Sequence, residues 1–392
     1  MPWLTGWPHR KRIVIDPAHV DADLVDFPLA LILDADHDLG RLARTDGADL
    51  RFAAADGVTP LPYERETYAS DGASASAVLH VRAPLVSASN ETALYLYFGR
   101  ADAPDGEDAP GVWSNGFDAV WHLGPNLRDS AGGYRLANQS TADTAGRLAR
   151  GRSIDGGWAH GLHAPDASLD PPEDGLTLSL WARRNGATGN IRQALVSKYD
   201  GWSASEWRWS WFVDDSDGRV TFRSFSNTFD TGWFLPLGSW THLALVQDAS
   251  TATLYADGEP VATGPPVAFD AGADAEVSIG VLSETNGHSS FLGALDEVRL
   301  KADTPTTVLL GPFVDRDDGV TPETGVDLAT ADAAQIFKHG SSTPVDIAGR
   351  AFAHVGGGWY ALDLEASDLD TEGRLIVIVR DNDLCLPVWS AF

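Results

Sequence analysis

The chain has 392 residues, 43% of them hydrophobic, so it is long enough for several domains and apolar enough to fold. Its 28 basic and 56 acidic residues give a net charge of −28, which excludes nucleic-acid binding and disfavours anionic membrane surfaces. The single cysteine, Cys385, excludes an intrachain disulfide. We find neither a basic-then-apolar leader nor an apolar run of about 18 residues, so we expect no signal peptide and no membrane insertion.

The first predicted domain covers residues 1–112. Apolar runs at 27–33, 78–81 and 93–99 predict strands, and Asp56-Gly57 marks a turn. We find no long stretch with an apolar residue every three or four positions, here or elsewhere, so we expect very little helix.

The second predicted domain covers residues 113–304 and has the clearest strand pattern. Runs at 176–182, 207–213, 241–246 and 291–300 carry apolar residues at every second position. This period places alternate side chains on opposite faces of a strand, and Asp-Gly or Gly-Ser pairs separate the runs. The pattern predicts a sandwich of antiparallel strands.

The third predicted domain covers residues 305–392, after a linker around 303–307. Runs at 358–364 and 373–379 predict strands. The fold class expected for the whole chain is therefore all-β, with tandem jelly-roll β-sandwiches followed by a small C-terminal β-sandwich.

Sequence words in the first two domains resemble known families. Residues 46–52 (DGADLRF), 61–64 (LPYE) and 96–99 (LYFG) resemble the domain of unknown function 2341. Residues 238–244 (GSWTHLA) and 291–299 (FLGALDEVR) resemble the laminin-G-like, concanavalin-A-like lectin domain. The first resemblance implies a small β-sandwich, often placed before a lectin-like domain, and the second implies glycan binding.

The third domain is similar to a small module of tailed-bacteriophage structural proteins. The resemblance rests on residues 311–315 (GPFVD), 358–360 (GWY) and 386–389 (LPVW). It implies a role in a virion, as part of a tail fibre, spike or decoration.

Tryptophans and polar neighbours in the second domain are candidates for sugar binding. Indole faces stack on the C–H faces of pyranose rings, and nearby polar groups bind hydroxyls. The three tryptophans of the 207–213 run are two residues apart and are expected to share one face. That face could equally be the inner face of the sandwich, which leaves a core role open. The candidate residues are Trp202, Trp207, Trp209, Trp211, Arg208, Asn227 and Trp233.

Calcium is a possible cofactor, because laminin-G-like domains often hold one ion at the rim of the sandwich. By this resemblance Asp155 and Asp296 are candidate ligands. Acidic loops at 214–218 and 315–319 are further candidates. Each of these aspartates could instead be a structural residue that caps a turn.

Hydrolytic chemistry is not expected. Glycosidases of concanavalin-A-like fold carry paired carboxylates on one strand, and we find no E-x-D-x-x-E run here. We also find no G-x-S-x-G, H-E-x-x-H or P-loop motif. We therefore predict that the protein is not an enzyme, and a glycan hydrolase remains an alternative.

The predicted function is that of a bacteriophage virion structural and adhesive protein that binds a host-surface glycan. Other virion proteins are expected partners, and a homo-oligomer, a trimer by analogy with phage adhesins, would multiply weak sugar contacts. The alternatives are a capsid decoration protein without sugar binding and a prokaryotic cell-surface adhesin.

Overall fold

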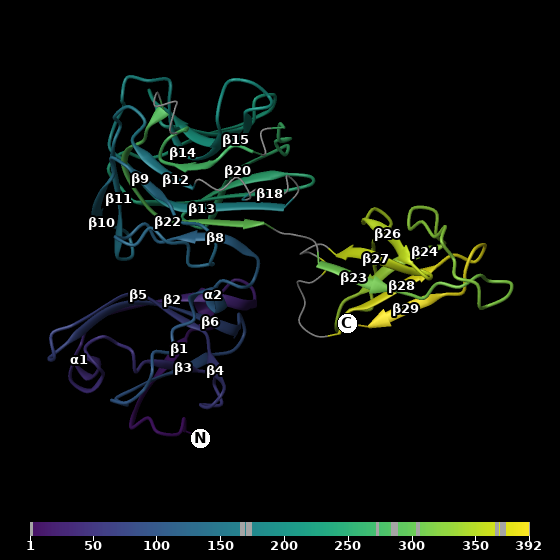
Figure 1. Ribbon diagram of the computed structural model, residues 1–392, viewed down its shortest axis with the longest axis horizontal. Helices are drawn as coiled ribbons and strands as arrows, with labels where there is room; N and C mark the ends of the chain where they lie inside the picture. The colour runs from purple at the N-terminus through teal and green to yellow at the C-terminus, as the bar shows by residue number, and fades with distance from the viewer. Residues whose placement is uncertain are drawn as a thin grey trace. The chain divides into compact units, whose positions relative to one another are not determined.

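The computed structural model describes residues 3–164, 169, 175–271, 274–283, 289–302, 306–364, 368 and 374–391. The chain divides into two compact units, residues 1–302 and 303–392 (Figure 1). Antiparallel strands dominate both, which confirms the predicted all-β fold class. In the described part of the chain no helix is long and apolar enough to cross a membrane.

The first unit begins with a small sandwich of two sheets. One has the strand order β1-β7-β3-β4 and the other the order β2-β6-β5. Their bounds are β1 (His9–Ile15), β2 (Leu24–Asp36), β3 (Arg51–Ala53), β4 (Pro60–Leu61), β5 (Tyr63–Ser70), β6 (Ala75–Val86) and β7 (Thr92–Phe98). We call this the N-terminal sandwich. Its core includes Leu50, Phe52, Leu79 and Leu96, all at most 1% exposed.

Among the described residues of the first unit there are three short helical segments: η1 (Pro17–His19), α1 (His37–Leu42) and α2 (Ala109–Val112). Asp36 caps α1, because its side chain accepts hydrogen bonds from the backbone N–H groups of Asp38 and Leu39. Asp108 caps α2 in the same way through the N–H of Gly111.

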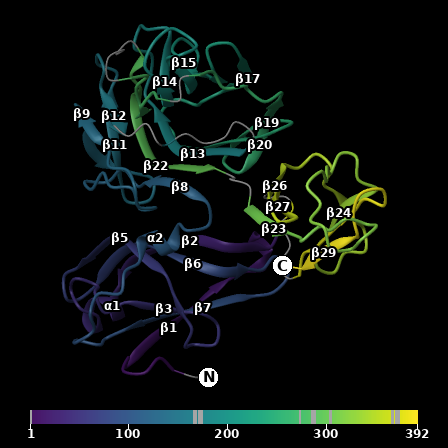
Figure 2. The ribbon, with the colours of Figure 1, turned by 45° about the vertical axis from the view of Figure 1, so that its right-hand side comes forward.

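The rest of the first unit is a larger sandwich, which we call the lectin-like sandwich. One sheet has the order β10-β11-β22-β13-β18-β19-β20, with β8 also paired to β22, and the other has the order β17-β16-β15-β14-β21-β12-β9 (Figures 1 and 2). The bounds of the first sheet are β8 (Phe117–Trp121), β10 (Ala142–Ala145), β11 (Arg150–Asp155), β13 (Gly175–Arg184), β18 (Thr241–Asp248), β19 (Ala252–Ala256), β20 (Glu259–Gly264) and β22 (Leu292–Ala302). Those of the second are β9 (Ala137–Gln139), β12 (Gly161–Ala164), β14 (Arg192–Tyr199), β15 (Trp207–Asp214), β16 (Arg219–Arg223), β17 (Thr228–Phe234) and β21 (Val277–Ile279).

The core of the lectin-like sandwich is formed by side chains from both of its sheets. Leu178, Leu180 and Leu243 contribute from one sheet, and Trp211 and Phe222 from the other. The period of two predicted this arrangement, because alternate residues of each strand point inward.

The described residues of the second unit form two small sheets of antiparallel strands. Their orders are β23-β27-β26 and β25-β24-β28-β29. The bounds are β23 (Thr306–Leu310), β24 (Ala333–Phe337), β25 (Val345–Asp346), β26 (Phe352–Gly356), β27 (Trp359–Leu364), β28 (Ile376–Arg380) and β29 (Val388–Ala391). Phe313, Ile336, Leu362 and Val377 are fully buried in its core, and Cys385 is buried as a free thiol.

Candidate functional site

A bulge in the pairing of β14 with β15 separates the three tryptophans of β15. The register shifts between Lys198 and Tyr199, so that Lys198 pairs with Trp209 but Tyr199 pairs with Trp207. One extra residue in a strand moves its next side chain to the opposite face. Trp207 accordingly packs with Tyr199 in a small separate cluster, whereas Trp209 and Trp211 lie in the main core.

Two exposed aromatic side chains lie beside Trp207 on the outer face of this sheet. Trp202 is 58% exposed and packs edge-on against Trp207, with ring centroids 5.3 Å apart. Phe225 is 42% exposed and lies 6.3 Å from Trp207. Trp207 itself is 1% exposed, so it is a buried ring in contact with two exposed rings.

Two guanidinium groups complete this surface. Arg223 stacks over the ring of Trp207 at 4.7 Å, and Arg192 lies 4.5 Å from Phe212 and 5.9 Å from Trp202. Burial lowers the pKa of Arg192, and the nearby charge of Arg223 lowers it further. Burial also lowers the pKa of Arg223. We name Trp202, Trp207, Phe225, Arg192 and Arg223 the aromatic–arginine patch.

Polar atoms around the patch have no hydrogen-bond partner in the described structure. They are Nη1 of Arg192, Nε1 of Trp207 and Oγ of Ser210. Ser210 pairs with Arg223 across β15 and β16, so it lies on the same face. Buried polar groups are normally satisfied, so these three atoms are unusual, and they lie beneath the surface of the patch.

The other residues predicted to bind sugar have different positions. Trp209 and Trp211 are fully buried in the core, which is the alternative left open above, and we no longer assign these two to a sugar site. The expectation that all three tryptophans share one face is wrong, because Trp207 lies in a separate cluster. Trp233 packs partly buried against the same core. Asn227 is exposed in the turn that carries Phe225, and Arg208 donates to the carbonyl of Asp270.

Both aspartates predicted as calcium ligands have structural partners. Asp155 is exposed and accepts hydrogen bonds from the N–H of Gly157 and from His160. Asp296 is buried and accepts from the N–H groups of Arg147 and Leu148. Burial and the neighbouring charge of Glu297 raise the pKa of Asp296 to about 7. Each aspartate therefore orders a turn, and calcium binding remains an untested prediction.

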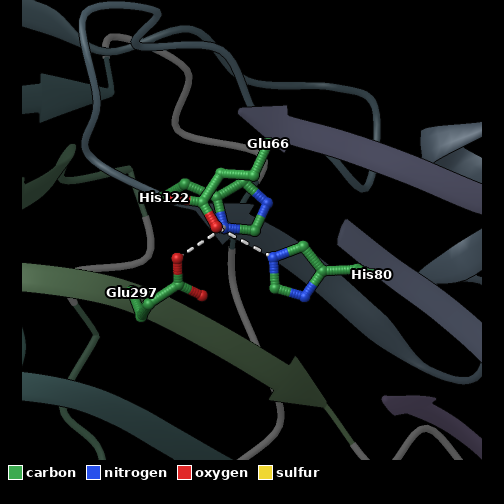
Figure 3. A group of neighbouring side chains, drawn as sticks. All are labelled: Glu66, His80, His122 and Glu297. Atoms are coloured by element: carbon green, nitrogen blue, oxygen red, sulfur yellow. Dashed lines mark hydrogen bonds and ion pairs between the residues drawn. The ribbon is translucent and has the colours of Figure 1, made fainter. Parts of the chain in front are cut away.

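A second cluster of functional side chains lies between the N-terminal and lectin-like sandwiches of the first unit. It consists of Glu66 from β5, His80 from β6, His122 after β8 and Glu297 from β22 (Figure 3). Leu79 and Val81 point into the core of the N-terminal sandwich, so His80 points away from it and toward the other sandwich. We call these four residues the His–Glu cluster.

Distances within the His–Glu cluster are short. Nε2 of His80 lies 3.0 Å from a carboxylate oxygen of Glu66. Nδ1 of His122 lies 2.7 Å from Glu297 and 3.8 Å from Glu66. The side chains of His80, Glu66 and Glu297 are at most 5% exposed, and that of His122 is 9% exposed.

Glu64 lies beside the His–Glu cluster and forms a hydrogen bond with one of its members, His122. It pairs with His80 across β5 and β6, and its carboxylate accepts hydrogen bonds from Nε2 of His122, Nε1 of Trp113 and the hydroxyl of Ser130. Trp113 in turn contacts both imidazole rings.

The four titratable side chains of the cluster strongly shift one another's pKa values. Burial raises the pKa of Glu66, and the nearby carboxylate of Glu297 adds to this, giving about 9. Burial lowers the pKa of His80 to about 3. Burial opposes the charge on His122, yet Glu297 and Glu64 raise its pKa well above the usual value. The pKa of Glu297 is lowered because His122 and Arg299 outweigh its burial.

The pKa of Glu64 is lowered as well, to about 2. Its burial acts in the opposite direction, but the hydrogen bonds from His122, Ser130 and Trp113 stabilise the carboxylate. In the absence of any bound ion, the cluster thus consists of a protonated Glu66, a neutral His80, and a charged His122 between the carboxylates of Glu64 and Glu297.

Irregular backbone brings these side chains together. A register shift leaves Glu66 without a paired residue in β6. A second shift, in the pairing of β13 with β22, lies at Glu297, whose φ is +52°. Leu123, next to His122, has a φ of +58°. Positive φ is uncommon outside glycine, and bulges are frequent beside functional sites.

Sequence reasoning missed the His–Glu cluster. Glu297 lies in the lectin-like motif of residues 291–299, and His122 lies in none of the motifs quoted above. One signal was available in His80, a titratable residue inside the apolar 78–81 run, with Glu64 and Glu66 two residues apart in a nearby strand. Their proximity to Glu297 depends on the fold of both sandwiches.

Family comparisons match the first two predicted domains in the predicted order. Residues 46–122 match the domain of unknown function DUF2341. Residues 155–307 match the concanavalin A-like lectin/glucanases superfamily, in the family Laminin_G_3. These matches confirm the two resemblances and leave the resemblance of residues 305–392 to phage modules untested. The predicted domain boundaries also remain predictions.

No curated protein sequence matches the chain. Among solved structures, domain 4 of the GH43 extracellular arabinanase AbnA from Geobacillus stearothermophilus has a TM-score of 0.40 and 20% identity, covering 48% of this chain and 92% of that one. The binding domain of Paraclostridial Mosquitocidal Protein 1 has a TM-score of 0.38 and 11% identity, covering 71% and 92%. The CBM40 domain of the Ruminococcus gnavus IT-sialidase has a TM-score of 0.28 and 14% identity, covering 42% and 91%.

Proposed function

We propose that the lectin-like sandwich binds carbohydrate through the aromatic–arginine patch. The observation that carries this proposal is the arrangement of exposed Trp202 and Phe225 around the buried ring of Trp207. Exposed indoles suit stacking on sugar rings, whereas most large aromatic side chains are buried. The match of residues 155–307 to a lectin and glucanase superfamily supports the proposal.

The arginines define the class of glycan. Arg192 and Arg223 place positive charge beside Trp202 on a chain whose net charge is −28. Guanidinium groups donate paired hydrogen bonds to carboxylates and sulfates. The preferred ligand is therefore a glycan that carries an acidic group next to a sugar ring.

A glycan array probed with the full-length protein tests this function. The wild type should bind acidic glycans, and Trp202→Ala should lose most of the signal. Trp158→Ala is the matched control, because Trp158 is 60% exposed but follows β11 in the other sheet. Equal binding by wild type and Trp202→Ala would contradict the proposal. Parallel arrays with calcium and with a chelator determine whether the ion contributes.

The more specific part of the proposal is a role in a bacteriophage virion. It rests on the resemblance of residues 305–392 to modules of tailed bacteriophages, with other virion proteins as partners and a homotrimer as the assembly. Portal and tail genes beside the coding sequence would support it, whereas secretion genes would favour a prokaryotic cell-surface adhesin. A mass measurement in solution tests the trimer.

Binding without catalysis is also part of the proposal. It rests on the missing E-x-D-x-x-E run in the sequence. Incubation with the bound glycan and an assay for new reducing ends tests it, and release of such ends would favour the hydrolase.

The remaining alternative is a capsid decoration protein without sugar binding. Such a protein would bind no glycan on the array.

A further inference from the structure

We propose that Glu66, His80, His122 and Glu297 bind one divalent transition-metal ion, zinc in the first instance, and that this ion joins the N-terminal and lectin-like sandwiches. The site lies in the first unit, away from the aromatic–arginine patch, and does not depend on sugar binding. Figure 3 shows the four side chains pointing toward a common centre.

The ligand atoms are spaced as a metal requires. One nitrogen or oxygen from each residue lies within 4.8 Å of all the others. A tetrahedral zinc site, with bonds of about 2.0–2.2 Å, separates its ligand atoms by about 3.4 Å. The separations of 2.7, 3.0 and 3.8 Å within the cluster lie on both sides of this value. Small side-chain rotations would therefore complete the site.

The donor set favours zinc over calcium or magnesium. Two imidazole nitrogens and two carboxylate oxygens form a borderline set, whereas calcium and magnesium require mostly oxygen ligands. Glu64 accepts a hydrogen bond from Nε2 of His122, so that Nδ1 faces Glu297 and the centre of the cluster. This arrangement of carboxylate, histidine and metal is the usual one for histidine ligands.

His80 can also act as a ligand, although it lacks the second hydrogen bond that His122 makes. Its Nδ1 is buried and has no hydrogen-bond partner in the described structure, so no acceptor fixes the proton on one ring nitrogen. The ring can therefore carry its proton on Nδ1 and present the lone pair of Nε2 to an ion beside Glu66.

The buried charges also balance when a dication is bound. Glu64, Glu66 and Glu297 bring three carboxylates together, and Arg299 donates to Glu297. With both histidines neutral, the two charges of the ion and the one of Arg299 balance the three carboxylates. Buried charges without such compensation are costly.

The ion has a route to the site. A pocket of about 130 Å³ opens beside the cluster, and its lining includes Glu64, Glu66 and His122. Because each sandwich supplies two ligands from its strands or their ends, the bound ion would stabilise the pairing of the two sandwiches.

Zinc titration of the metal-free full-length protein by calorimetry tests the proposal. For the wild type we expect one zinc per chain and a higher melting temperature with zinc. In Glu66→Gln and His80→Gln the affinity for zinc should fall by about 100-fold or more. His163→Gln is the matched control, because His163 is also buried in the lectin-like sandwich but outside the cluster. Equal affinity in wild type and both cluster variants overturns the proposal.

A cobalt experiment on the wild type does not depend on whether the variants fold. Cobalt(II) in a four-coordinate site absorbs visible light far more strongly than six-coordinate cobalt. Intense bands that disappear on addition of one equivalent of zinc would support the site. Weak bands, or bands that excess zinc leaves unchanged, would overturn it.

Discussion

The imidazole rings of His80 and His122 stack on each other with centroids 4.7 Å apart and an interplanar angle of 18°. One ring belongs to the N-terminal sandwich and the other to the lectin-like sandwich. Burial lowers the pKa of His80, and the nearby charge of His122 lowers it further, because two imidazolium ions at this distance repel each other. The stacked rings therefore couple the protonation of His80 in the N-terminal sandwich to that of His122 in the lectin-like sandwich.

The proposed role of Glu64 as a positioning residue leads to the first prediction. Glu64→Gln should retain one zinc per chain but bind it about 10–100-fold more weakly, because the amide orients His122 less well. Calorimetric titration of the full-length protein measures this. Glu107→Gln is the control, since Glu107 lines the same pocket but bonds to Arg65. Unchanged affinity in Glu64→Gln would show that His122 is positioned without this carboxylate.

The different positions of Trp202 and Trp209 lead to a second prediction. Trp209→Ala removes a fully buried ring from the core and should lower the free energy of unfolding by about 3–5 kcal/mol. Trp202→Ala removes an exposed ring and should change stability by less than about 0.5 kcal/mol while weakening glycan binding. Denaturant unfolding and binding assays on both variants check this division. Substantial destabilisation by Trp202→Ala would indicate a structural role instead.

The positive charge of the aromatic–arginine patch leads to a third prediction. Arg192→Gln should weaken binding of acidic glycans about 10-fold while leaving neutral analogues nearly unaffected, because one charge-assisted hydrogen bond is lost. Raising the salt concentration should weaken the wild type more than the variant. The control is Arg128→Gln, which lies in the pocket beside the His–Glu cluster. An equal loss for acidic and neutral glycans would place Arg192 in a purely steric role.

Asp215 leads to a fourth prediction, on pH. It is buried and accepts hydrogen bonds from Thr188, Gly189 and Gln193, which together outweigh its burial and lower its pKa below the usual 3.8. A lowered folded pKa means that the stabilisation is complete above pH 3.8 and is lost as pH falls toward the folded value. Asp215→Asn should therefore cost about 1–3 kcal/mol near neutral pH and less near pH 3.

Calorimetric melting at the two pH values measures the effect of Asp215→Asn. Asp217→Asn provides the control, because Asp217 is exposed in the same turn and its side chain accepts the N–H of Arg219. A constant difference in stability between wild type and Asp215→Asn at both pH values would mean that ionisation of Asp215 does not contribute.

Much of the fold could be predicted from local patterns. The alternation through 207–213 and 241–246 predicted strands with one buried face, and β15 and β18 lie there. Trp209 and Trp211 follow this alternation into the core. Trp207 does not, because a one-residue bulge depends on how β14 pairs with β15 and leaves no mark in the spacing of the apolar residues.

The candidate sites were less predictable for a related reason. Trp202 lies in the polar stretch Asp200–Ser203, and such a position favours exposure. The His–Glu cluster has no sequence motif, because its four residues come from β5, β6, the end of β8 and β22. Their meeting depends on two irregular backbone positions, the shift at Glu66 and the left-handed Glu297, which no propensity indicates.

The hydrogen bond from Trp113 to Glu64 crosses the domain boundary predicted between residues 112 and 113. A fragment that begins after residue 112 would keep His122 and Glu297 but lose Glu64, Glu66 and His80. The same reasoning applies to gene rearrangement: either sandwich joined to an unrelated neighbour would carry unbalanced charges at its boundary. The two sandwiches should therefore be inherited and exchanged together, as a single evolutionary module.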